Sequence, residues 1–269
     1  MARVRFWLTS QGDNLRQRRV ARPHYSSLVS NRMRITQQPA YVLHVRPWRE
    51  TSLLLETFTR DFGRVGLIAR GVRSARARLS RSALEPLQAL RMDWSGRGEL
   101  QTLTAVEPAG APHVFRGDAL LSAMYVNELL VRLTARNDSH PRLFDRYGEL
   151  LDGLAGAPSL AWQLRCFERD LLAAIGYALQ LETAADTGEA IDSGRVYDYL
   201  PEEGPIGAGE HQGSVRVRGS ALLALARGTF PDVEDLAALR RLMRTVIGTH
   251  VGERGLQSWR VLAGTLRQG

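Results

Sequence analysis

A basic tract in the N-terminal half is the segment whose residue types best suit a chemical role. It runs from Arg70 to Arg81 and holds five arginines and no acidic residue. Each arginine stays protonated, and its planar guanidinium can donate two hydrogen bonds to one phosphate. Such a tract beside a folded domain predicts a nucleic-acid-binding surface; the alternative is a solvated loop. The predicted contacts are Arg46, Arg49, Arg64, Arg70, Arg73, Arg76, Arg78 and Arg81.

The charge of the chain is unevenly distributed. Residues 1–81 contain 17 arginines and four acids, a net charge of +13, whereas the remainder carries −5. This asymmetry predicts a polyanion-binding surface in the first part and a surface for a different partner in the second. Arginine-rich codon usage is an alternative that explains the choice of arginine over lysine, but it does not explain the asymmetry.

The composition argues against several kinds of catalysis. The chain has no lysine, so a Schiff base, a nucleotidyl-lysine intermediate and a phosphate-loop lysine are all excluded. Cys166 is the only cysteine, which excludes an intramolecular disulfide and fits a reducing cytoplasm. The six histidines are scattered and no apolar run reaches 18 residues. We therefore expect no enzymatic activity, no cofactor, no metal site and no membrane span.

A small β-barrel is predicted over residues 39–109. The turn Arg60-Asp61-Phe62-Gly63 joins two of its strands, with the glycine placed for a positive φ. Several short strands within one such segment favour an OB-fold, and an SH3-like barrel is the alternative. The strand-like segments are 41–46, 51–59, 64–69, 84–94 and 99–106. Residues 1–38 are basic and aperiodic; they are either an arm without fixed structure or a mis-assigned start before Met33.

An all-helical domain is predicted over residues 116–269, which gives an α+β chain. Apolar residues recur every four positions from Leu121 to Leu133, and further helices are expected at 141–154, 160–175, 220–226, 232–249 and 256–266. Residues 183–218 form an irregular Gly- and Pro-rich insertion with strand-like pieces at 195–199 and 214–218. Basic residues late in the helix 232–249 complement its dipole, and a second DNA contact is the alternative; these residues are Arg240, Arg241 and Arg244.

Co-linear motifs give the chain a resemblance to a known family over residues 33–262. The first motif resembles the N-terminal signature of the RecO DNA-repair proteins, and two later motifs are similar to that family's helical segments. The first comprises Tyr41-Val42-Leu43-His44, Trp48-Arg49-Glu50-Thr51-Ser52-Leu53-Leu54, Phe58-Thr59-Arg60-Asp61-Phe62-Gly63 and Ala69-Arg70-Gly71-Val72-Arg73; the others are Tyr125-Val126-Asn127-Glu128-Leu129-Leu130 and Phe167 to Tyr177.

The resemblance implies an OB-fold followed by a helical domain, in a non-enzymatic recombination mediator of the bacterial cytoplasm and nucleoid. Such a protein binds single- and double-stranded DNA, anneals complementary strands and helps to load the RecA recombinase. The implied protein partners are RecR and the C-terminal tail of the single-stranded-DNA-binding protein. The tail would dock on Tyr125, Leu129 and Arg132, unless Arg132 pairs within its helix with Glu128.

The chain departs from the family pattern at one place. Many RecO proteins carry a four-cysteine zinc module near the stretch that corresponds to Glu182–Glu189, and here those positions hold no cysteine. The resemblance therefore implies that zinc is absent and that packing alone holds residues 183–218. Two other functions stay open: a metal-dependent nuclease with an OB specificity domain, and an RNA-binding OB protein of the translation apparatus.

Overall fold

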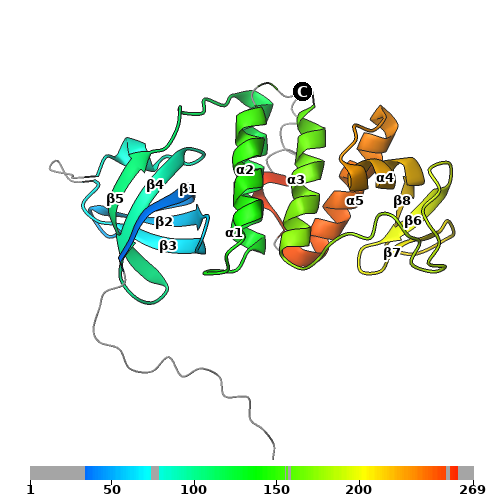
Figure 1. Ribbon diagram of the computed structural model, residues 1–269, viewed down its shortest axis with the longest axis horizontal. Helices are drawn as coiled ribbons and strands as arrows, with labels where there is room; N and C mark the ends of the chain where they lie inside the picture. The colour runs from blue at the N-terminus through cyan, green and yellow to red at the C-terminus, as the bar shows by residue number, and fades with distance from the viewer. Residues whose placement is uncertain (1–33, 74–78, 155, 157–158, 253–254, 260–269) are drawn as a thin grey trace, which may run out of the picture. The chain divides into compact units, whose positions relative to one another are not determined.

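A five-stranded β-barrel precedes a mostly helical part in the computed structural model of the chain (Figure 1). The structure describes residues 34–73, 79–154, 156, 159–252 and 255–259. Within the described residues, no helix combines the length and the apolar character needed to cross a membrane.

The barrel has the strand order β1-β2-β3-β5-β4 and is closed by pairing between β1 and β4. Only β3 and β5 pair in parallel among these strands. This is the predicted OB-fold topology. Alternate side chains such as Val42, Leu55 and Leu67 are 0% exposed and fill the interior. The strands are β1 (Arg34–Trp48), β2 (Ser52–Thr59), β3 (Gly63–Ala69), β4 (Ala89–Ser95) and β5 (Leu100–Pro108), with a 3₁₀ helix η1 (Arg81–Leu84) between β3 and β4.

The barrel begins earlier than the sequence predicts. β1 starts at Arg34 rather than near residue 39, and Ile35 pairs with Trp94 of β4. The pairing register then shifts between Ile35 and Gln38, where Gln37 has a φ of +53°. This bulge interrupts the alternation of inward and outward side chains that a strand normally shows, so the sequence at the start of β1 has no period of two. The rest of the predicted arm lies outside the described residues.

The β2–β3 turn confirms the predicted role of its glycine. Gly63 has a φ of +64°, a value that favours glycine. A Cβ at this position would lie 1.8 Å from the carbonyl oxygen of Asp138. The turn therefore needs glycine both for its backbone conformation and for the close approach of the segment between α1 and α2.

The second part is mostly helical but also contains a small sheet. Strands β6 (Val196–Leu200), β7 (Gly204–Gly207) and β8 (Val215–Arg218) form an antiparallel sheet of order β7-β6-β8, so the description as all-helical is incomplete. The missed strand β7 reads Gly-Pro-Ile-Gly, a composition depleted in strand formers. Most of the helix predicted at 256–266 lies outside the described residues. The helices are α1 (Gly117–Leu133), α2 (Pro141–Leu154), α3 (Leu160–Ala174), α4 (Gly219–Arg227) and α5 (Val233–Val251).

The barrel and the helices share a core of aromatic side chains. Tyr41 of β1 packs against Phe144 and Tyr147 of α2, with ring centroids 5.2 and 4.8 Å apart, and Phe58 of β2 joins the same cluster. A Cβ at Gly148 would lie 2.9 Å from the Tyr41 hydroxyl oxygen, so α2 approaches the barrel closely there. The buried cluster continues through α1, α3 and α5.

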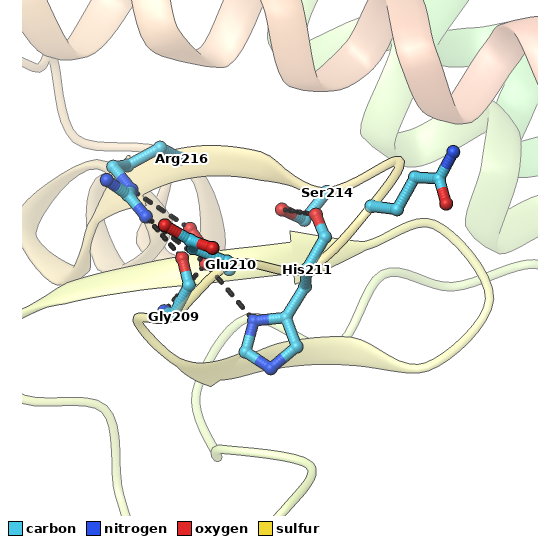
Figure 2. A pocket seen from close by; sticks show the side chains of 7 residues that line it. Gly209, Glu210, His211, Ser214 and Arg216 are labelled. Atoms are coloured by element: carbon cyan, nitrogen blue, oxygen red, sulfur yellow. Dashed lines mark hydrogen bonds and ion pairs between the residues drawn. The ribbon is translucent and has the colours of Figure 1, made fainter.

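A buried carboxylate supports the segment that leads from β7 into β8, where Gly209, His211 and Arg216 lie close together (Figure 2). Asp198 of β6 is 2% exposed and accepts hydrogen bonds from Arg216 Nε at 3.0 Å and from the Gly209 amide at 2.8 Å, while His211 Nδ1 lies 3.2 Å away. These bonds, first that of Arg216 and then that of Gly209, hold the pKa of Asp198 well below its usual value. The prediction that packing alone holds residues 183–218 is therefore wrong, because a polar network around Asp198 supports this segment as well. No cluster of three metal-binding side chains occurs in the described part of the chain.

Candidate nucleic-acid interface

One end of the barrel brings several predicted DNA contacts together. The amide of Arg73 donates to the carbonyl oxygen of Thr51 at 3.0 Å, which ties the segment after β3 to the β1–β2 turn. Arg49 lies in that turn, and Arg70 directly follows β3. Arg46 lies near the end of β1, opposite Leu54 of β2. We call Arg46, Arg49, Arg70 and Arg73 the barrel-end arginines.

The barrel-end arginines keep their charges available. All four are exposed, and none forms an ion pair with a carboxylate in the described residues. Glu50 is the one acid of the β1–β2 turn itself. Trp48, at the end of β1, is half-buried and belongs to neither hydrophobic core cluster of the described chain. The site thus offers guanidinium groups to phosphates and an indole ring on which a base can stack.

Arg64 does not belong to this site, contrary to the prediction. Its guanidinium donates to Glu56 Oε2 at 3.0 Å and to the carbonyl oxygen of Thr134 at 2.9 Å, and only 14% of its side chain is exposed. Glu56 also pairs with Arg136. Arg64 therefore joins the barrel to the end of α1, and Arg136 shares the Glu56 carboxylate with it.

The remaining predicted contacts fall into two groups. Arg76 and Arg78 lie outside the described residues, so their prediction stays open. Arg81 is exposed at the start of η1, which packs against β5. A DNA-binding role for Arg81 stays a prediction, because η1 is a separate element from the β1–β2 turn.

The predicted tail-docking residues do not form an open surface. Tyr125 is 6% exposed and donates its hydroxyl to Glu168 Oε1 at 2.6 Å, and Leu129 is 0% exposed in the core. Burial raises the pKa of the Tyr125 hydroxyl well above its ordinary value. Both side chains are therefore interior residues that hold α1 against α3, and the expectation that they are accessible is wrong for this structure.

The alternative pairing within α1 is not formed either. Arg132 is exposed and donates to the carbonyl oxygen of Gly255 at 3.0 Å. The carboxylate of Glu128 accepts from the amides of Gln257 and Ser258, at 2.6 and 2.9 Å. Both side chains thus anchor residues 255–259 along α1. These partners are more than 120 residues away in sequence, so helical spacing could not reveal them.

Asn127 is a structural residue to which the sequence assigned no role. The pairing register of β1 and β2 shifts between Val42 and His44, which leaves Leu43 without a partner in the ladder. Asn127 Nδ2 donates to the Leu43 carbonyl oxygen at 3.1 Å, and the Tyr147 hydroxyl donates to Asn127 Oδ1 at 2.5 Å. One amide therefore links the barrel, α1 and α2.

Comparison with known proteins places this geometry in a family. The family model described as "Recombination protein O N terminal" matches residues 33–112, which include the barrel, and the model described as "Recombination protein O C terminal" matches residues 115–260. A protein named "DNA repair protein RecO" from Aromatoleum aromaticum is 45% identical over 235 residues, which cover 87% of this chain and 98% of that protein.

Other relatives carry the same name. The protein from Nitrosococcus oceani is 45% identical over 84% of this chain and 92% of its own length. The one from Xylella fastidiosa is 44% identical over 86% of this chain and 96% of its own length. These names support a role in DNA repair. With both halves matched in order and the relatives covered almost completely, the chain belongs to the RecO family of DNA repair proteins.

Proposed function

We propose that the barrel-end arginines bind the phosphate backbone of single- and double-stranded DNA, and that the protein uses this binding to anneal complementary strands. The observation that carries the proposal is a group of four exposed, unpaired guanidiniums in the described residues, gathered where the β1–β2 turn meets the segment after β3. Neutralising phosphates on one strand lowers the repulsion that a second strand meets. This step needs binding energy and no covalent chemistry.

The family membership supports a wider form of the proposal. In this wider form, the protein is a recombination mediator of the bacterial nucleoid that works with RecR. It also engages the tail of the single-stranded-DNA-binding protein and helps to load RecA. Arg132 is the predicted tail contact that is exposed in this structure. A docking tail would have to compete with the Gly255 carbonyl oxygen for this guanidinium.

Charge reversal at the barrel end tests the DNA-binding part of the proposal. The test variant is R49E/R70E/R73E, and the matched control is R116E/R142E/R227E, which changes the net charge equally at exposed arginines of other elements. Fluorescence anisotropy with labelled oligo-dT would give the affinity at several salt concentrations. Loss of three phosphate contacts should make the slope of log affinity against log salt shallower by about 2.

The control separates a local effect from a general one. We expect R116E/R142E/R227E to keep the wild-type slope because its arginines lie outside the proposed site. A folded R49E/R70E/R73E variant, verified by circular dichroism, that keeps both the wild-type affinity and the wild-type slope would refute the assignment. Preference of the wild-type protein for structured RNA over single-stranded DNA would instead favour an RNA-binding role.

An annealing assay tests the mediator part. Complementary strands would be coated with single-stranded-DNA-binding protein, and their pairing would be followed by energy transfer between end labels without ATP or metal. We expect wild-type protein to accelerate pairing, and we expect RecR to change the rate. Acceleration on naked strands alone would leave DNA binding in place and remove the claim that the protein engages the coat.

A further inference from the structure

Helix α5 presents three arginines on one exposed face. Arg240, Arg241 and Arg244 stand at positions i, i+1 and i+4 of the helix, and all three are exposed. None of them forms an ion pair in the part of the chain that the structure describes. The buried face of the same helix, which includes Leu239, Leu242 and Met243, packs into the core. The arginine face is therefore fixed in direction.

Helix stability does not account for these arginines. The favourable effect of a cation at a helix C-terminus fades within the last turn, and Arg244 lies about two turns before Val251, where α5 ends. The basic residue of the last turn is His250. Arg240 and Arg244 form a like-charged i,i+4 pair, which by itself destabilises a helix. The cluster therefore works against the local structure, and a ligand of opposite charge would relieve this repulsion.

An aromatic ring accompanies the cluster. The guanidinium carbon of Arg244 lies 4.9 Å from the ring centroid of Trp259, a cation–π contact, and Trp259 is half-buried. The segment that carries the ring is held by Leu256, which is 1% exposed, and by the bonds from its amides to Glu128. Arginine beside a partly exposed aromatic ring is the combination that binds single strands, with phosphates on the cation and a base on the ring.

The neighbouring charges leave the cluster with a positive excess. A cavity of about 240 Å³ beside Arg241 is also lined by Arg216, Arg218, Glu234 and Asp235. Arg218 pairs with Glu234 at 2.9 Å, and Asp235 is buried and accepts the Ser220 hydroxyl at 2.6 Å. The charge of Arg216 is matched by Asp198. Around this cavity and on the adjoining face of α5, the arginines without a carboxylate partner in the described residues are Arg240, Arg241 and Arg244.

We propose that Arg240, Arg241, Arg244 and Trp259 form a second nucleic-acid contact, which binds the backbone of a second single strand. The proposal rests on the proposed function of the barrel end, since a second strand matters only when a first is bound. Two separate strand contacts on one chain would let the protein hold both partners of an annealing reaction. The elements differ, with β1–β3 at the first contact and α5 with residues 255–259 at the second.

A strand-capture assay separates the two contacts. One oligo-dT strand is immobilised, the protein is bound, and capture of a second, labelled oligo-dT strand is measured, so that base pairing plays no part. The test variant is R240E/R241E/R244E, and R116E/R142E/R227E is again the charge-matched control. We expect the α5 variant to bind the first strand as wild type does, to lose second-strand capture by tenfold or more, and to show a capture slope against salt shallower by about 2.

Substitution of Trp259 tests base stacking separately from charge, because it should change second-strand capture without changing the charge of the protein. Trp259→Ala should weaken second-strand capture without changing its salt slope, because it removes a stacking surface and no charge. Trp259→Phe keeps an aromatic ring and should restore most of the capture. If Trp259→Ala captures the second strand as well as wild type does, the base-stacking part of the inference is wrong.

The outcomes distinguish this inference from the proposed function. If R49E/R70E/R73E loses the first strand while R240E/R241E/R244E loses only the second, both stand. Unchanged capture and annealing by the folded α5 variant would overturn the second contact and leave the barrel-end proposal intact. Failure of the wild-type protein to bind the first strand would overturn the proposed function itself. If polyglutamate, but not DNA, competes for the α5 arginines, the face binds an acidic protein and the inference is also overturned.

Discussion

Replacing Asn127 by alanine should destabilise the chain by about 2–6 kcal/mol, because it leaves two buried groups without partners. The carbonyl oxygen of the bulged residue Leu43 would lose its donor, and the hydroxyl of Tyr147, which is 0% exposed, would lose its acceptor. Each buried polar group left unsatisfied costs about 1–3 kcal/mol. Both lost hydrogen bonds lie where the barrel meets α1 and α2.

A double-mutant cycle with Tyr147→Phe tests whether the amide and the hydroxyl act as one unit. Alone, Tyr147→Phe should cost about 1–3 kcal/mol because Asn127 Oδ1 loses its donor. In the Asn127→Ala background it should cost less by about 1–2 kcal/mol, since it then removes a hydroxyl that is already unpaired. The coupling energy reports the hydrogen bond between Asn127 and Tyr147, because Tyr147→Phe keeps the packing of the ring.

Urea unfolding monitored by circular dichroism would measure these free energies, with an unchanged dependence on denaturant as evidence that the folded and unfolded states are comparable. Met124→Ala, on the exposed face of α1, is the control and should change stability by less than about 0.5 kcal/mol. Additivity of the two substitutions within about 0.5 kcal/mol would refute the network. A loss of stability below about 0.5 kcal/mol for Asn127→Ala would show that the Leu43 carbonyl oxygen does not need this donor.

Other substitutions test the turn, the buried carboxylate and the thiol. Gly63→Ala should lower the melting temperature more than Gly98→Ala, because both have positive φ but only the Cβ at Gly63 meets a backbone oxygen, that of Asp138. The pKa of Asp198 is depressed by folding, so its contribution to stability is full above about pH 4 and is lost as the pH falls further; the stability gap between wild type and Asp198→Asn should therefore narrow in acid unfolding experiments. Burial raises the pKa of the Cys166 thiol, so iodoacetamide should alkylate it more slowly at pH 8 than it alkylates the urea-unfolded chain.

The barrel could be predicted because its signals are local. Alternating apolar residues such as Leu53 and Leu55 mark the inner face of β2, and Gly63 marks the turn that follows. The bulged start of β1 could not be predicted, since Gln37 takes its conformation together with a bond from its amide to Asp93 at 2.8 Å, a residue 56 positions away. Local pattern therefore revealed regular strands, whereas the irregular one depends on contacts that form only in the fold.

The predicted tail-docking residues show a limit of regular local patterns. Tyr125 and Leu129 share one face of a helix, and periodicity shows that this face is apolar but not whether it meets a partner or the interior. The structure settles the point because α3 supplies Glu168 as the acceptor for the Tyr125 hydroxyl. A tyrosine on an apolar face needs such an acceptor when it is buried, and its identity was the missing information.

Arginine has to serve two purposes in a chain without lysine, and the carboxylates decide which purpose each arginine serves. Arg60, for example, donates to both oxygens of Asp145, at 3.0 and 2.9 Å, and so joins the β2–β3 turn to α2. A bidentate contact of this kind suits a fixed joint as well as it suits a phosphate, so counting positive charges in the sequence cannot separate the two uses. Arginines that the structure matches with a carboxylate are structural by this criterion, and examples are Arg60, Arg64, Arg165 and Arg216. Arg116, Arg142 and Arg227 are also exposed and without a carboxylate partner in the described residues, but each lies on a different element. The barrel end and α5 each bring several such arginines together, which is why the two charge-reversal variants, rather than the total charge of the chain, test how it handles DNA.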